Sequence, residues 1–146
     1  MSKLLALVRP LALPLAWLMS TVSMVGSLYA SEILHFAPCN LCWYQRLAMY
    51  PLVLILAIAM LRDDKKVTVY ALPLSVVGWL FGFYQNLLYY RLVTETIALC
   101  TNSTPCTTQY LHLFGFVDFP LLSLLAFTAI IILLLVSREP KTSVLK

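Results

Sequence analysis

The chain has 146 residues and a formal net charge of +4, with 62% hydrophobic and only 11% charged residues. Soluble domains carry about 25% charged residues, so this composition excludes an ordinary soluble fold. The positive charges are few and lie between apolar blocks, which also argues against a nucleic-acid-binding surface.

Four segments are long and apolar enough to cross a bilayer, which takes about 20 apolar residues in a helix. In chain order they are residues 11–33, 43–61, 67–90 and 119–136. Strands of a membrane barrel alternate over about 10 residues, and these runs do not. The sequence therefore predicts an all-α fold, an integral membrane four-helix bundle forming one domain over residues 1–146.

Two features refine the first and last helices. The first apolar run is longer than a signal-peptide core and is not closed by a small-residue cleavage site, so we expect it to be retained. Pro14 is expected in the first turn of this helix, and Pro120 near the start of the last, just after Asp118 as its N-cap. Pro51 and Pro73 fall deeper, where proline kinks a helix.

Lysine and arginine placement predicts the orientation of the bundle, because cytoplasmic loops carry the excess of these residues. With alternating spans, three clusters fall on one side: Lys3 and Arg9; Arg62, Lys65 and Lys66; Arg138, Lys141 and Lys146. Both termini are therefore expected in the cytoplasm. The loops at about residues 34–42 and 91–118 then face outward, and all four cysteines lie in them or at their rim.

The first cysteine pair, Cys39 and Cys42, forms a Cys-x-x-Cys motif at the outer end of the second predicted helix. Two intervening residues let one turn bring both sulfurs together in a reducible disulfide. The positive end of the helix dipole would stabilise a thiolate there. A zinc half-site is the alternative, but neither a second such motif nor a His-x3–5-His pair accompanies it. The motif thus favours redox chemistry, with no bound metal.

Arg46 and Gln45 follow Cys42 by four and three residues, so both share its helix face. A charge this close to hydrocarbon costs a few kcal/mol and tends to mark a function. We expect Arg46 to support a Cys42 thiolate and, with Gln45, to bind a carbonyl-bearing electron acceptor. The alternative is that Arg46 extends to the lipid headgroups.

The second pair, Cys100 and Cys106, has five intervening residues in the long outer loop. A disulfide in such a loop is open to attack by the thiolate of another protein, although a simple loop staple is also possible. Together the two pairs suggest a relay from a protein dithiol to a lipid-soluble acceptor. A membrane quinone is the simplest such acceptor, because the chain shows no haem or flavin motif.

The run Cys39-Asn-Leu-Cys-Trp-Tyr-Gln-Arg46 resembles the Cys-x-x-Cys-x-x-x-Arg signature of the DsbB family of disulfide bond formation proteins, and most closely its Gram-positive BdbC branch. Further similar stretches are Gly26-Ser-Leu-Tyr29, Met49-Tyr-Pro-Leu52 and Phe114-Gly-Phe116. Family members often have a histidine near the outer end of the third helix. Here that region reads Tyr84-Gln85-Asn86, so a hydrogen bond from this helix to a quinone must come from an amide or a tyrosine.

The resemblance implies a protein-dithiol oxidoreductase of the bacterial plasma (inner) membrane. Cys100 and Cys106 would exchange with a thioredoxin-like partner of the DsbA or BdbD type, with Cys100 forming the mixed disulfide. Cys39 and Cys42 would then receive the electrons, with Cys42 and Arg46 nearest a menaquinone or ubiquinone.

Three other functions remain open from the sequence. A reductase resembling vitamin K epoxide reductase also sets such a motif beside a quinone, but late in the chain. A membrane scaffold would use both pairs as permanent disulfides. A metal-binding membrane protein would hold stoichiometric zinc.

Overall fold

The computed structural model describes residues 2–36, 38–64, 66–93 and 119–138. Within these residues it consists of four helices, α1 (Ser2–Glu32), α2 (Asn40–Arg62), α3 (Val67–Tyr89) and α4 (Phe119–Ser137). All four are long and apolar enough to cross a membrane. The predicted all-α, four-helix membrane fold is therefore confirmed.

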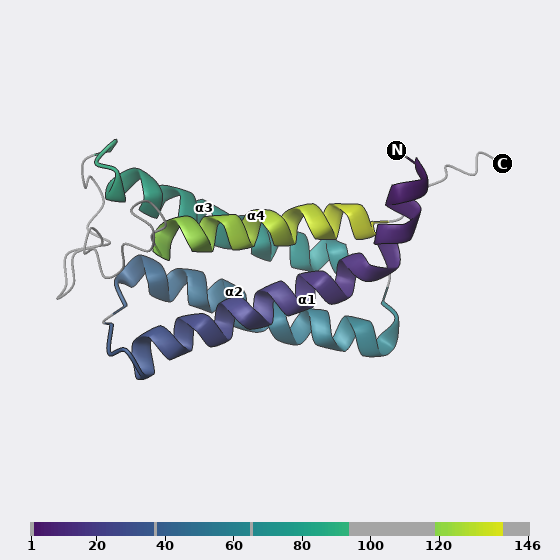
Figure 1. Ribbon diagram of the computed structural model, residues 1–146, viewed down its shortest axis with the longest axis horizontal. Coiled ribbons are helices and arrows are strands. Elements are labelled where there is room, and N and C mark those ends of the chain that lie inside the picture. The colour runs from purple at the N-terminus through teal and green to yellow at the C-terminus, as the bar shows by residue number, and fades with distance from the viewer. Residues whose placement is uncertain (1, 37, 65, 94–118, 139–146) are drawn as a thin grey trace.

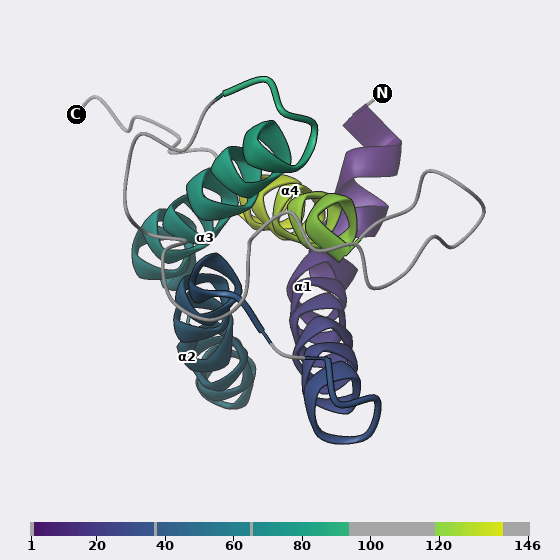
Figure 2. The ribbon, with the colours of Figure 1, turned by 90° about the vertical axis from the view of Figure 1, so that its left-hand side faces the viewer.

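The helices run alternately up and down, so the start of α1 and the end of α4 lie at one end of the bundle (Figure 1). The connection between α1 and α2 lies at the opposite end, beside the end of α3 and the start of α4. Each helix packs on two neighbours, α1 on α2 and α4, and α3 on α2 and α4. Figure 2 shows this ring of four helices end-on. The ring brings the first turn of α2 against the last turns of α3.

The outer surface of the bundle is apolar, as a lipid-facing surface must be. Many large aliphatic side chains on it are more than half exposed, among them Val22 at 60%, Leu47 at 71%, Leu54 at 65%, Val69 at 72% and Ile132 at 55%. Water would strongly disfavour so much exposed apolar area, whereas hydrocarbon does not. The surface pattern thus agrees with four membrane-spanning helices.

The first candidate membrane span, Pro10–Glu32, agrees with the predicted residues 11–33, but α1 continues back to Ser2. Pro14 therefore lies inside the helix and not in its first turn, as the sequence had suggested. Both Pro10 and Pro14 lie inside α1. Proline lacks an N–H and its ring crowds the preceding turn, so it bends a helix that continues through it. The first turns of α1 are accordingly bent away from the rest of that helix (Figure 1).

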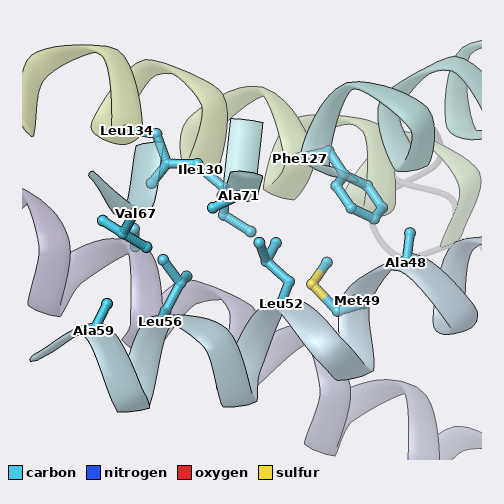
Figure 3. Packing of buried hydrophobic residues seen from close by; sticks show 11 residues of the cluster. Ala48, Met49, Leu52, Leu56, Ala59, Val67, Ala71, Phe127, Ile130 and Leu134 are labelled. Carbon is cyan, nitrogen blue, oxygen red and sulfur yellow. The ribbon is translucent and has the colours of Figure 1, made fainter. Parts of the chain in front are cut away.

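The interior is formed by apolar side chains from all four helices (Figure 3). Leu52 and Leu56 of α2 and Phe127 and Ile130 of α4 are almost fully buried there. On α1 the residues facing inward are small and spaced by four, namely Ala12, Ala16 and Ser20, each 0% exposed. Small residues let helix backbones approach closely, which favours association within a membrane because water supplies no hydrophobic drive there.

Gly78 of α3 lies directly against the side chain of Phe127 of α4. A Cβ atom added there would lie 2.3 Å from both Cε1 and Cζ of Phe127. The Phe127 ring is only 1% exposed, so it cannot move aside freely. Glycine at 78 therefore leaves the room that the Phe127 ring occupies between α3 and α4.

We predict that Gly78→Ala lowers the free energy of unfolding by about 1–3 kcal/mol, because it overpacks a filled interior. Gly26→Ala is the matched control, since nothing lies within 4 Å of a Cβ at that position. Alanine has a higher helix propensity than glycine at both positions, so a difference in stability between the two variants reports the clash with Phe127 alone. Thermal unfolding in detergent, followed by circular dichroism, measures the difference. Equal stability of the two variants would contradict the proposed close packing.

Candidate functional site

The Cys-x-x-Cys motif spans the first turn of α2. This helix begins at Asn40, earlier than the predicted residue 43, with Cys39 in the extended conformation of an N-cap (φ −71°, ψ 168°). The carbonyl oxygen of Cys39 accepts a hydrogen bond from the Trp43 N–H at 3.1 Å, which closes the first turn. Cys42 consequently lies within that turn, over the positive end of the helix dipole.

The first turn brings the two sulfurs together. Cys39 Sγ and Cys42 Sγ lie 2.8 Å apart as a hydrogen-bonded thiol pair. A disulfide bond is about 2.05 Å long, so a small movement suffices to form it. Cys39 is only 6% exposed and packs with Leu41 and Leu88, whereas Cys42 is half-buried. The pair therefore lies at the junction of α2 and α3.

Gln85 of α3 contacts both cysteines. Its Nε2 atom donates to Cys42 Sγ at 3.3 Å and to Cys39 Sγ at 3.5 Å. The Gln85 side chain is only 4% exposed. Sequence reasoning treated this stretch of α3 as a source of hydrogen bonds to a quinone and missed its contact with the sulfurs. The available signal was the polar run Tyr84-Gln85-Asn86 in an otherwise apolar helix.

The two thiols differ in their environments. The hydrogen bond with Cys42 and burial both raise the pKa of the Cys39 thiol above its usual range. Cys39 therefore stays protonated at neutral pH and donates its S–H toward Cys42. The arrangement makes Cys42 the more nucleophilic sulfur of the pair.

Arg46 lies one turn along α2 from Cys42, as the sequence predicted, but its side chain reaches toward α1. Its Nε donates to Ser27 Oγ at 2.9 Å, and its Nη2 donates to the Ser27 carbonyl oxygen at 2.8 Å. The guanidinium also lies 5.5 Å from the centre of the Trp43 ring, within cation–π range. These contacts hold the charge at a fixed place, which a side chain extended to the headgroups would not show.

Gln45 is buried and points toward α3, where its Nε2 donates to Gln85 Oε1. It thus reaches the cysteines only through Gln85. Asn86 ties α3 to α4, because its Nδ2 donates to the carbonyl oxygens of Gly82 and Pro120, each at 2.8 Å. These amides form a polar layer beneath the cysteine pair.

Several predicted residues lie outside the described part of the chain. They are the second pair, Cys100 and Cys106, and the expected N-cap Asp118. The roles of all four cysteines, and those of Arg46 and Gln45 in binding a cofactor, stay predictions.

Comparison with known proteins gives a consistent match. The family model of disulfide bond formation protein DsbB matches residues 9–137. The chain is 42% identical to a probable disulfide formation protein C 2 of Bacillus cereus, over 92% of this chain and 96% of that protein. It is 42% identical to disulfide bond formation protein C of Bacillus subtilis, over 87% of this chain and 92% of that protein. A probable disulfide formation protein of Metapseudomonas resinovorans is 44% identical, over 88% and 90% of the two chains. No solved structure matches the chain significantly.

We predict that a thiol reagent modifies Cys42 before Cys39. The physical reasons are the raised pKa and the burial of Cys39. The test uses the reduced protein with Cys100 and Cys106 changed to alanine, treated with iodoacetamide at pH 7. Peptide mass spectrometry then counts the label on each cysteine over time. Preferential labelling of Cys39 would contradict the assignment.

Proposed function

We propose a function for this chain from one premise: it belongs to the DsbB family of disulfide bond formation proteins. It is accordingly a disulfide-forming oxidoreductase with membrane-spanning helices. The specific activity proposed is quinone-dependent. The chain reoxidises a thioredoxin-like disulfide donor outside the cytoplasm and transfers the electrons to a quinone in the membrane.

The observation that carries this proposal is the position of the dithiol. Cys39 and Cys42 lie 2.8 Å apart at the end of a bundle whose outer surface is apolar. We infer that an acceptor dissolved in lipid approaches this pair from the apolar flank of the bundle, and a protein thiol from the aqueous side. A permanent structural disulfide would not need Gln85 to donate to both sulfurs, because a disulfide sulfur accepts only weak hydrogen bonds.

The proposed relay balances electrons and protons across both cysteine pairs. Formation of a disulfide in the partner releases two protons and two electrons. Attack by a partner thiolate opens the Cys100–Cys106 bond, which restores the partner disulfide and leaves two thiols in this loop. Exchange with Cys39–Cys42 then re-forms the loop disulfide and reduces the pair on α2. Re-formation of the Cys39–Cys42 disulfide then releases two electrons and two protons, for which a quinone held beside the pair would be the acceptor.

The residues around the pair fit a carbonyl-bearing group. Within the part of the chain that the structure describes, the buried Tyr84 hydroxyl has no hydrogen-bond partner, and Tyr84 packs against the cluster of Cys39, Leu41 and Leu88. The contacts of Arg46 with Ser27 use two of its five N–H donors. We propose that Arg46 and Tyr84 would hold the quinone carbonyls, with Gln45 supporting the site from below. Either menaquinone or ubiquinone has the required carbonyls.

The proposed location is the plasma (inner) membrane of a bacterium, with the cysteines on the outer side. Support comes from the alternating helices, which put the start of α1 and the end of α4 at one end and the motif at the other (Figure 1). Of the positive residues, Arg62 at the end of α2, Lys66 just before α3 and Arg138 just after α4 lie toward the former end. A partner of the DsbA or BdbD type would then meet the chain outside the cytoplasm.

The first test mixes a reduced thioredoxin-like partner, the purified protein and a soluble quinone analogue without oxygen. We expect quinone absorbance to fall by one equivalent for each partner dithiol oxidised. Alanine at Cys39, Cys42, Cys100 or Cys106 should each abolish this turnover. Quinone reduction that persists without these cysteines would refute the proposal.

Thiol trapping in intact cells separates the proposal from a scaffold with permanent disulfides. We expect both cysteine pairs to accumulate in the reduced form when respiration is blocked, because the acceptor then stays reduced. Structural disulfides would stay oxidised in both conditions. Stoichiometric zinc in the purified protein would instead favour the metal-binding alternative.

The role of Arg46 makes a separate prediction. Arg46→Ala should raise the KM for the quinone analogue at least tenfold and change the KM for the partner little, because it removes the charge expected at the carbonyl group. Ser27→Ala is the matched control, since it removes one of the two contacts of Arg46 and keeps the guanidinium. Wild-type quinone kinetics in Arg46→Ala would show that the arginine only joins α1 to α2.

A further inference from the structure

A pair of buried glutamines, Gln45 of α2 and Gln85 of α3, connects the cysteines to the interior of the bundle. Gln45 is 6% exposed and Gln85 is 4% exposed. We call these two residues the amide pair. Burying an amide among apolar side chains is costly unless its donors and acceptors are paired. Two such residues facing each other across a helix interface therefore need a reason beyond packing.

The hydrogen bonds of the amide pair run in one direction, toward the sulfurs. Gln45 Nε2 donates to Gln85 Oε1, which fixes the Gln85 carbonyl on the side away from the cysteines. Gln85 Nε2 then points at the sulfurs, 3.3 Å from Cys42 Sγ and 3.5 Å from Cys39 Sγ. If the Gln85 amide were rotated by 180°, its carbonyl oxygen would face both sulfurs. That oxygen would then no longer accept the hydrogen bond from Gln45. Gln45 thus sets which end of Gln85 the cysteines meet.

A donor aimed at a sulfur favours the thiolate over the thiol. Hydrogen bonds to charged groups are stronger than those between neutral groups, especially away from water. The dithiol carries negative charge on Cys42 when it is ready to lose electrons, because Cys39 keeps its proton. An amide holds this charge without gaining or losing a proton itself. A histidine near the end of this helix, as other family members often have, would titrate between about pH 5 and pH 8.

We propose that Gln85 is a catalytic residue that stabilises the Cys42 thiolate during electron transfer, and that Gln45 is the positioning residue that orients it. This inference deepens the proposed function and rests on it. In this proposal, the sulfur of Cys42, which donates the electrons, has a hydrogen-bond donor on α3, namely Gln85. This role is separate from that of Arg46. Because an amide does not titrate, the hydrogen bond from Gln85 to Cys42 keeps the same donor at every pH.

The test measures the rate at which iodoacetamide modifies Cys42 in the reduced protein, with Cys100 and Cys106 changed to alanine. The readout is the rate at pH 5 divided by the rate at pH 10, where an ordinary cysteine thiol is ionised. Gln85→Met matches glutamine in length and lacks the donor. We expect it to lower this ratio about tenfold, equivalent to about 1.4 kcal/mol. An unchanged ratio would overturn the proposal.

A double variant separates reactivity from stability. Gln85→Met alone leaves the buried Gln45 amide without its acceptor and should destabilise the bundle. Gln45→Met combined with Gln85→Met removes both amides, so the stability should recover while the Cys42 ratio stays low. If reactivity recovered together with stability, the amide pair would be merely structural.

Asn86→Leu is the matched control, because it removes a buried amide of the same helix that bonds to Gly82 and Pro120. Its ratio should stay within twofold of the wild type, and a tenfold fall would also overturn the proposal.

Gln85→His supplies a rescue. A donor is restored, so reactivity should exceed that of Gln85→Met, but the pH profile should show two inflections, one from the Cys42 thiol and a second from the imidazole, where the wild type shows only the first. A wild-type profile in this variant would count against the proposal. The alkylation test needs neither quinone nor partner. A negative result in it would therefore contradict the role of Gln85 and leave the quinone-dependent function open to its own test. A failed quinone assay with the expected alkylation pattern would instead refute the proposed function alone.

Discussion

The interior of a bilayer offers no hydrogen bonds, and this constraint governs the position of polar side chains in the bundle. A polar group there must find its partner within the protein. Ser20 and Thr21 bond to the Trp17 carbonyl of their own helix, and Trp79 of α3 donates to Thr128 of α4 at 2.9 Å. Cys39, Cys42 and the amides of Gln45 and Gln85 form a hydrogen-bonded polar cluster at one end of α2 and α3. Placing polar groups in hydrocarbon costs free energy, so a polar cluster at this position indicates a functional role.

The reactive pair depends on a single helix start. Because α2 begins directly after Cys39, the first cysteine is held in an extended conformation and the second lies one turn inside the helix. This geometry places the sulfurs together and makes them inequivalent, one buried and protonated, the other nearer the surface and over the helix dipole. A dithiol with two identical sulfurs would have no preferred direction for passing electrons onward.

Close packing of the helices makes the contacts of this site possible. Gly78 and Phe127 fix the approach of α3 to α4, and Asn86 joins the same helices near the cysteine end. On the other side of the site, Arg46 bonds α2 to α1 through Ser27. The end of the bundle that holds the cysteines is therefore braced on both sides. The relatives and the family model identify disulfide formation as the activity of the family, and we propose that this end of the bundle performs it.

The sequence by itself determined the fold class, because four apolar runs of this length can satisfy their backbone groups in hydrocarbon only as helices. It also determined that Cys39 and Cys42 are close, since a separation of three residues spans one helical turn. It could not place the start of α1, because the run through Pro10 and Pro14 is equally compatible with a helix that begins after them. Only the tertiary structure decided that Gln85 donates to both sulfurs and that Gln45 orients it. Those contacts join residues 40 or more positions apart, and their existence depends on how α2 and α3 rotate and approach, which no local pattern encodes.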